Sequence, residues 1–122
     1  MKTILIIEDE MALSKTLKEY LLREKFEILS AFDGETGLLM AKEKLPDLVL
    51  LDIILPKKDG YAVLDELRSD EKTEKIPVII LTNMESSDDV RRALERGVTT
   101  YLIKSNYKME DILVKVKEAL RL

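Results

Sequence analysis

At residues 48–52 the sequence reads Leu48-Val49-Leu50-Leu51-Asp52, four apolar residues followed directly by a carboxylate. A short apolar run without polar alternation is typical of a strand that is buried on both faces. Such strands belong to parallel sheets, because crossover helices cover both faces of the sheet. The stretch therefore predicts a central strand that ends on Asp52.

Four similar apolar runs lie at residues 4–7, 28–31, 78–81 and 101–103. Segments with apolar residues at helical spacing follow each of the five runs. These stripes are Leu13, Leu17, Tyr20 and Leu21; Leu38, Ala41 and Leu45; Tyr61, Leu64 and Leu67; Val90, Ala93 and Leu94; and Met109, Ile112, Leu113, Val116 and Leu120. For the fourth helix, Ser86 or Ser87 is the expected N-cap and Gly97 the expected stop.

The alternation of strand and helix predicts five βα units, with parallel strands and right-handed crossovers. We expect one α/β domain over residues 1–122, which is an ordinary domain length. The predicted architecture is a doubly wound, five-stranded parallel sheet between two helical layers. The expected strand order is 2-1-3-4-5, as in flavodoxin.

Composition excludes several functional classes. The chain has no cysteine and no histidine, which excludes disulfides, thiol catalysis, thiolate metal sites and histidine bases. Its 20 basic and 24 acidic residues give a net charge of −4, so no binding of nucleic acid is expected. No apolar run approaches the ~20 residues of a membrane span, and none fits a signal peptide. We therefore expect a cytoplasmic protein that does not bind membranes.

The ends of the predicted strands carry polar residues. In doubly wound sheets, ligands bind beyond the carboxyl ends of the strands, where the strand order reverses. The sequence places Glu8 and Asp9 after the first strand, Asp52 after the third, Thr82 at the end of the fourth and Lys104 after the fifth. Each alone has a plain structural interpretation, such as a helix cap or a solvated charge, but together they indicate one site.

The predicted proximity of Glu8, Asp9 and Asp52 has an electrostatic cost. Two carboxylates ~4 Å apart repel by about 4 kcal/mol at an effective dielectric constant near 20. Lys104 supplies one positive charge, which leaves −3 + 1 = −2. Oxygen ligands suit a hard divalent cation, Mg²⁺ or Mn²⁺, and Mg²⁺ commonly binds carboxylates together with substrate phosphate. The sequence thus predicts a site that receives a phosphoryl group.

The motifs at these positions resemble the receiver domain of two-component response regulators, including chemotaxis regulators. The resemblance covers essentially the whole chain, in the order and spacing of the family. The stretches that carry it are residues 6–10, 50–56, Asp59-Gly60, Leu81-Thr82 and 101–104.

The resemblance implies a role for each site residue. Asp52 would be the nucleophile and the site of phosphorylation. Asp9, Asp52 and the backbone carbonyl of Ile54 would bind Mg²⁺ directly, with Glu8 acting through water.

Three further residues would support phosphorylation and the response to it. Lys104 would bind Asp52 and then a phosphoryl oxygen. The Thr82 hydroxyl would move to the phosphoryl group, and Tyr101 would swing inward behind it.

The resemblance also implies partners. A sensor histidine kinase or a histidine phosphotransfer protein would donate the phosphoryl group, because a chain without histidine cannot be its own donor. The fourth helix, fifth strand and fifth helix would form the altered surface, which acts on a downstream protein or an output domain. Homodimerisation on activation is compatible with this surface. The chain would then be a signalling domain that catalyses only its own phosphorylation and dephosphorylation, and not an enzyme acting on other substrates.

Two positions depart from the family pattern. Ser105 stands where the family has a proline joined by a cis bond, and cis costs ~2.5–4 kcal/mol for other residues. We therefore predict that the Lys104-Ser105 bond is trans, or is held cis under strain. A trans bond makes the reach of Lys104 a question for the structure. Asn83 stands where the family has a small residue, and we hypothesise that it alters dephosphorylation.

Three alternatives remain open at this point. A flavin-binding flavodoxin would share the fold, but Glu8 and Asp9 would repel its phosphate. A phosphohydrolase of the haloacid dehalogenase type uses similar residues, although its nucleophile follows the first strand. A receiver-like module that no longer accepts phosphate is the third, because of Ser105 and Asn83.

Overall fold

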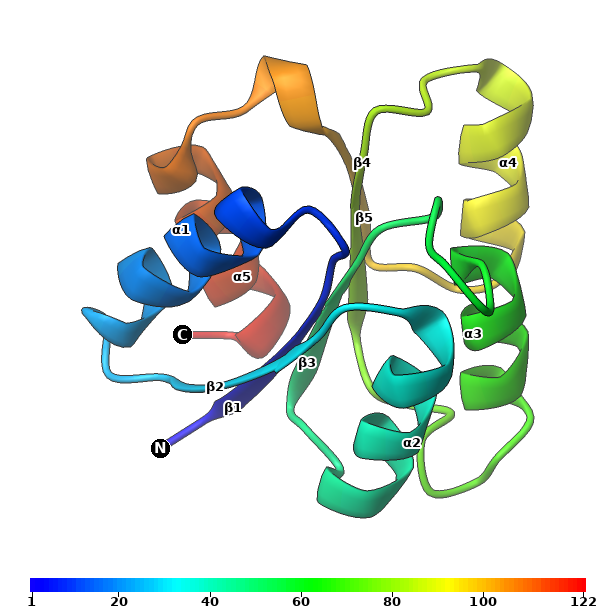
Figure 1. The fold of residues 1–122 in the computed structure, drawn as a ribbon, viewed down its shortest axis with the longest axis horizontal. Helices are drawn as coiled ribbons and strands as arrows, with labels where there is room; N and C mark the ends of the chain where they lie inside the picture. Colours follow the sequence, from blue (N-terminus) through cyan, green and yellow to red (C-terminus); the bar gives the residue numbers. More distant parts are fainter.

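The computed structural model describes residues 1–122, in which strands and helices alternate along the chain (Figure 1). The strands are β1 (Thr3–Ile7), β2 (Glu27–Ala31), β3 (Leu48–Leu51), β4 (Val78–Thr82) and β5 (Thr100–Ile103). The helices are α1 (Met11–Leu22), α2 (Gly34–Lys44), α3 (Gly60–Arg68), α4 (Ser87–Glu95) and α5 (Met109–Leu120), with a 3₁₀ turn at Lys104–Asn106. None of these helices combines the length and the apolarity that crossing a bilayer requires.

The five strands form one parallel sheet in the order β2-β1-β3-β4-β5. Helices α1 and α5 lie on one side of the sheet, and α2, α3 and α4 on the other (Figure 1). The predicted fold class and strand order are therefore confirmed. Each predicted apolar run coincides with a strand to within one residue at either end.

The sheet separates two hydrophobic cores, because successive residues of a strand point to opposite faces. In β1, Ile4 and Ile6 pack into the core beneath α1 and α5, whereas Leu5 and Ile7 pack into the core beneath α2, α3 and α4. All four are 1 % exposed or less. Burial on both faces explains why the strand sequences show no polar alternation.

Side-chain caps begin three of the helices. Asp33 accepts a hydrogen bond from the Thr36 amide at 2.7 Å, and Asp59 accepts one from the Ala62 amide at 2.9 Å. Ser86 caps α4, as predicted. Gly97 follows this helix with a φ of +73°, a conformation that favours glycine.

Two apolar residues of the predicted helical stripes are exposed. Leu45 follows the last residue of α2 in a left-handed conformation and is 48 % exposed, because the helix ends one residue earlier. Leu94 is 55 % exposed, because α4 lies on the sheet mainly through Ala93, its one buried residue. The apolar spacing predicted the helices correctly but overestimated the width of their buried faces.

Candidate functional site

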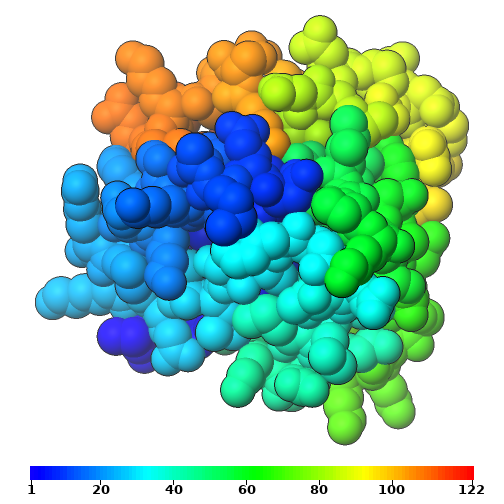
Figure 2. Space-filling view, viewed as in Figure 1, coloured from blue at the N-terminus to red at the C-terminus, as the bar shows by residue number.

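The segments after β1, β3, β4 and β5 meet at one edge of the sheet. In the space-filling view, the start of α1 (dark blue) lies beside the segments after β3 (green), β4 (yellow-green) and β5 (orange) (Figure 2). The backbone ladder continues one residue beyond the strands, since Asp52 N–H donates to the Ile7 carbonyl at 3.1 Å and Glu8 N–H to the Ala31 carbonyl at 3.0 Å. This ladder fixes Glu8 and Asp52 at the ends of the neighbouring strands β1 and β3.

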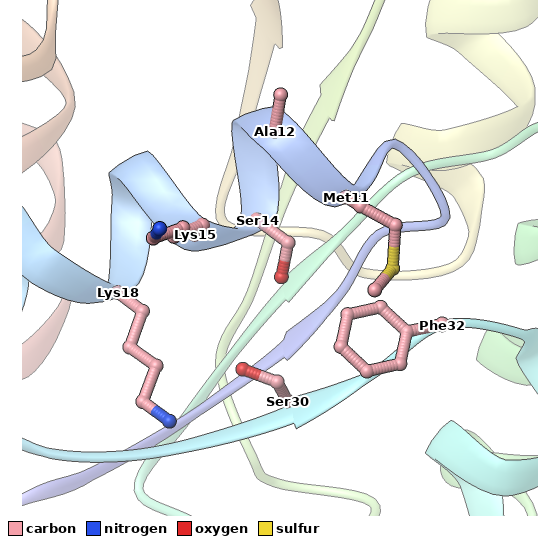
Figure 3. A pocket seen from close by; sticks show the side chains of 7 residues that line it. All are labelled: Met11, Ala12, Ser14, Lys15, Lys18, Ser30 and Phe32. Carbon is pink, nitrogen blue, oxygen red and sulfur yellow. The ribbon is translucent and has the colours of Figure 1, made fainter.

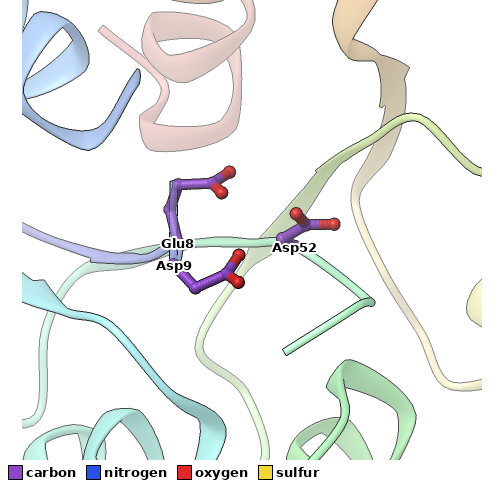
Figure 4. Close-up of side chains that lie close together, drawn as sticks. All are labelled: Glu8, Asp9 and Asp52. Carbon is purple, nitrogen blue, oxygen red and sulfur yellow. The ribbon is translucent and has the colours of Figure 1, made fainter. Parts of the chain in front are cut away.

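Glu8, Asp9 and Asp52 form a cluster in which one carboxylate oxygen from each lies within 4.8 Å of the others (Figure 4). Glu8 is 2 % and Asp52 6 % exposed, whereas Asp9 is exposed. The predicted convergence of the three carboxylates is confirmed. A cluster made only of carboxylate oxygens fits a hard divalent cation.

Lys104 lies against the buried part of this cluster. Its ammonium nitrogen is 2.8 Å from Asp52 Oδ2, 2.9 Å from Glu8 Oε1 and 3.9 Å from Glu10 Oε2. Burial disfavours the charged ammonium, but the hydrogen bonds to Asp52 and Glu8 outweigh it and raise the pKa of Lys104. The side chain therefore stays a cation and neutralises part of the acidic cluster.

The two buried carboxylates are held by the backbone as well. Glu8 Oε2 accepts a hydrogen bond from the Glu10 amide at 3.0 Å, and Asp52 Oδ1 accepts one from the Ile53 amide at 2.7 Å. Burial raises the pKa of Glu8 above its usual range, although Lys104 and the Glu10 amide oppose the shift. The Asp52 side chain is thus oriented at both oxygens, one by an amide and one by Lys104.

The Lys104-Ser105 bond is trans, which is the first of the two expected forms, because the structure contains no cis peptide bond. Strand β5 ends at Ile103, and the 3₁₀ turn Lys104–Asn106 follows it directly. Lys104 nevertheless reaches Asp52 at 2.8 Å. Replacement of the family proline by Ser105 therefore leaves the Lys104–Asp52 contact in place.

Thr82 and Ile54 lie at the same edge but do not form strong bonds to Asp52. Thr82 is completely buried, and its hydroxyl accepts a long bond of 3.4 Å from the Met84 amide. The Ile54 amide is 3.4 Å from Asp52 Oδ1, and its side chain is 63 % exposed. Asn83 is exposed.

Tyr101 is hydrogen-bonded to the loop between β4 and α4. Its hydroxyl donates to the Met84 carbonyl at 2.6 Å, and burial raises the pKa of Tyr101 to about 12. The sequence predicted Tyr101 as a switch residue but gave no sign of this acceptor. A backbone carbonyl carries no side-chain signal that could have revealed it.

Tyr61 forms a hydrogen bond to α4 that the sequence analysis did not predict. The hydroxyl donates to Asp89 Oδ1 at 3.0 Å, and the guanidinium carbon of Arg92 lies 3.9 Å from the ring centre. Asp89 and Arg92 are three residues apart and so share a helix face. That spacing was visible in the sequence, but the aromatic partner from α3 was not.

Comparisons with known proteins agree on the family. A sequence model of the family "Response regulator receiver domain" matches residues 4–117. The transcriptional regulatory protein CiaR of Streptococcus pneumoniae is 39 % identical over 118 residues, which are 97 % of this chain and 51 % of CiaR. The chain thus spans about half the length of curated relatives such as this one.

Solved structures show the same fold. The receiver domain of sensor histidine kinase PA1611 from Pseudomonas aeruginosa, with magnesium coordinated in its active-site cleft, superposes with a TM-score of 0.89 at 25 % identity, over 99 % of this chain and 98 % of that one. The Mn²⁺-bound form of response regulator Rcp1 has a TM-score of 0.84 at 33 % identity, over 100 % and 95 % of the two chains. With its fold, its strand-end residues and these likenesses in agreement, the chain belongs to the response regulator receiver domains of two-component signalling.

Proposed function

We propose that residues 1–122 form one receiver domain, which accepts a phosphoryl group on Asp52 from the phosphohistidine of a sensor histidine kinase or phosphotransfer protein. The observation that carries the proposal is the position of Asp52. Its carboxylate lies where the strand order reverses, in contact with Lys104 at 2.8 Å and clustered with Glu8 and Asp9.

Asp9, Asp52 and the backbone carbonyl of Ile54 would hold a divalent cation directly, and Glu8 would act through water. Three carboxylates beside a single lysine leave excess negative charge, which fits Mg²⁺ or, in its place, Mn²⁺. When bound, the ion neutralises negative charge on the phosphoryl oxygens. The metal ions of the PA1611 receiver domain and of Rcp1 support this assignment.

In the transfer, an Asp52 oxygen forms a bond to phosphorus while the bond from phosphorus to the donor's imidazole nitrogen breaks. The Asp52 carboxylate carries no proton, so the attack needs no general base. The leaving nitrogen keeps the electron pair of the broken bond, and the donor departs as neutral imidazole when its other ring nitrogen carries a proton. Lys104 already lies 2.8 Å from Asp52 and would stabilise the charge on the phosphoryl oxygens. The buried Thr82 hydroxyl would turn from its weak bond to Met84 and donate to one of those oxygens.

Phosphorylation would change the surface formed by α4, β5 and α5. A phosphoryl group replaces one negative charge by about −1.5 to −2 and adds acceptor oxygens. Recruitment of Thr82 would shift the β4–α4 loop, and the Tyr101 bond to the Met84 carbonyl would break as Tyr101 moves inward. The loop and the ring would thus couple Asp52 to the partner surface.

The relatives suggest what this surface controls. CiaR is a transcriptional regulatory protein twice as long as the matched segment. We infer that the domain acts on an output domain or a downstream protein, in the cytoplasm of a bacterium, with no nucleic-acid contact of its own. A homodimer formed through the α4, β5 and α5 surface is the second form of output that fits the proposal.

The test is intact-mass spectrometry after incubation with acetyl phosphate and Mg²⁺. We expect the wild type to gain the mass of one phosphoryl group and Asp52→Asn to gain none. Asp47→Asn is the matched control, because Asp47 lies outside the cluster, and it should be labelled like the wild type. No labelling of the wild type, or equal labelling of Asp52→Asn, contradicts the proposal, and steady turnover of a phosphomonoester would favour a phosphohydrolase.

Asn83 provides a second test at the same site. Asn83 is exposed and directly follows Thr82, whose hydroxyl would bind the phosphoryl group, so we propose that its side chain affects the approach of water to that group. We expect the aspartyl phosphate of Asn83→Ala to have a half-life different from that of the wild type. Equal half-lives, measured by loss of the phosphoryl mass after removal of the donor, would dismiss a role for Asn83.

A further inference from the structure

A cavity of about 430 Å³ lies between α1 and the edge strand β2, apart from the acidic cluster (Figure 3). The side chains of Ser14 and Ser30 point into it from opposite sides. Met11 and Phe32 line one end, with the Met11 side chain extending over the Phe32 ring. The cavity is therefore apolar at one end and carries hydroxyl groups at its base.

The hollow has a cause in the sequence. On α1, Ser14, Leu17 and Leu21 are the buried residues, and the two leucines pack into the core. On β2, Ile28 packs into the same core, and Ser30 follows two residues later on the same face. Two serines thus face each other where larger apolar residues would continue the core, and the space between helix and strand stays unfilled.

One of these hydroxyls lacks a partner. The oxygen of Ser30 is buried and makes no hydrogen bond. A buried polar atom without a partner costs about 1–3 kcal/mol. An occupant that exchanged a hydrogen bond with Ser30 would remove this cost.

The rim of the cavity is basic. Lys15 and Lys18 line it, and neither ammonium group takes part in an ion pair. At the apolar end, Met11 is 62 % and Phe32 41 % exposed, so a ligand can contact both. The rim therefore favours an occupant that combines negative charge with apolar surface.

We propose that this cavity is a binding site for a small organic acid with a flat apolar body. The body lies against Met11 and Phe32, the acid group lies near Lys15 and Lys18, and an oxygen atom accepts a hydrogen bond from Ser30. The site shares no residue with the acidic cluster. Binding therefore needs neither the metal nor phosphorylation of Asp52, and it is testable on the unmodified chain.

The test uses 2-naphthoate as the probe and follows amide chemical shifts by two-dimensional NMR. We expect saturable shifts at Ser14, Lys18, Ser30 and Phe32, with half-saturation below 1 mM. Neutral 2-naphthamide should bind at least tenfold more weakly, because it lacks the charge. Shifts that do not saturate by 10 mM, or equal binding of the two probes, overturn the proposal.

Variants separate the cavity from general surface binding. Ser14→Leu fills the cavity and should abolish saturable binding, and Ser30→Ala, a smaller change that keeps the space, should weaken it about fivefold. The double variant Lys15→Glu and Lys18→Glu should lose at least tenfold, whereas Lys72→Glu and Lys75→Glu, a matched pair of exposed lysines elsewhere, should match the wild type. Unchanged binding in the first three variants, each folded by its amide spectrum, would assign the probe to another surface and overturn the proposal.

Discussion

Lys104 is the residue on which the balance of charge at the sheet edge depends. Its side chain is only 13 % exposed, and the side chains of its partners Glu8 and Asp52 are 3 % and 7 % exposed. Removing one member of a buried ion pair leaves the other charge without compensation. Lys104 therefore has a structural role before any phosphoryl group arrives.

We expect Lys104→Met to lower the free energy of unfolding by about 3 kcal/mol in the absence of divalent metal. Mg²⁺ should restore more stability to this variant than to the wild type, because the variant cluster has lost its only cation. The measurement is urea unfolding with and without Mg²⁺. Lys115→Met is the control, since its ion pair with Glu118 is at the surface and such pairs contribute about 0–1 kcal/mol. Equal losses in the two variants would contradict the assigned role.

Tyr61 and Tyr101 give a test by pH. Burial raises the pKa of each to about 12, and for Tyr61 the hydrogen bond to Asp89 adds to the effect. A phenol whose pKa is higher in the folded than in the unfolded chain, where it is about 10, stabilises the fold below pH 10. That contribution is lost as the pH rises from about 10 to 12.

Spectrophotometric titration of tyrosinate absorbance should show that these two hydroxyls ionise at a higher pH than a free phenol. The part of the titration that is lost in Tyr61→Phe belongs to Tyr61, and the part that is lost in Tyr101→Phe belongs to Tyr101. We expect the midpoint pH of each part to lie well above the midpoint of N-acetyltyrosinamide, which is the control. The free energy of unfolding should fall over the same pH range. A component centred near pH 10 in folded protein would show that the hydroxyl concerned is not buried.

At the scale of elements, α4 is the helix with the fewest buried residues, and hydrogen bonds from α3 hold it at both ends. Only Ala93 of α4 is buried. Tyr61 binds Asp89 near its start, and beyond its end the Arg68 guanidinium donates to the carbonyls of Arg96 and Gly97, each at 3.0 Å. A helix attached in this way can change position when a few hydrogen bonds are exchanged, as a surface that responds to phosphorylation requires.

Tyr61→Phe removes the hydroxyl but keeps the ring beneath Arg92. We expect a loss of about 1 kcal/mol, concentrated in α4, because the substitution breaks a hydrogen bond to this helix. Amide hydrogen exchange in α4 should become about fivefold faster, while exchange in β1 stays at the wild-type rate. Tyr20→Phe on α1 is the matched control, and equal acceleration of α4 in that variant would argue against a specific tie.

At the scale of the whole molecule, the sheet brings together charges that are far apart in the chain. Residues 8, 52 and 104 follow three different strands, and the parallel order β1-β3-β4-β5 sets them at one edge. The two hydrophobic cores supply the stability that tolerates this concentration of charge. Neutralising the cluster should therefore stabilise the entire fold.

We expect Mg²⁺ to raise the Tm of the wild type in a concentration-dependent way. Binding to the native state alone stabilises by about 2.7 kcal/mol at one hundred times the dissociation constant. Asp9→Asn should reduce the shift, whereas Glu43→Gln, which removes an exposed carboxylate of α2, should leave it unchanged. Thermal unfolding followed by circular dichroism measures both, and an unchanged Tm at millimolar Mg²⁺ would contradict metal binding by the cluster.

The sequence by itself determined the fold and the composition of the site. Apolar runs such as residues 48–51 and the helical stripes between them are local patterns, so they could be read without knowing which segments touch. The predicted strand order then placed Glu8, Asp9, Asp52 and Lys104 at one edge of the sheet. These predictions succeeded because burial on both faces makes each strand a continuous apolar run, whereas burial of one face gives each helix an apolar stripe at helical spacing.

Only the tertiary structure decided the individual hydrogen bonds and packing contacts that these and other side chains make. The reach of Lys104 past a trans bond, the Tyr101 bond to the Met84 carbonyl and the packing of Tyr61 against α4 depend on loop paths and side-chain directions. The hollow between Ser14 and Ser30 depends on two residues sixteen positions apart that face each other across a layer. Such contacts leave no periodic pattern, because each is set by the three-dimensional fit of segments that are separate in the sequence.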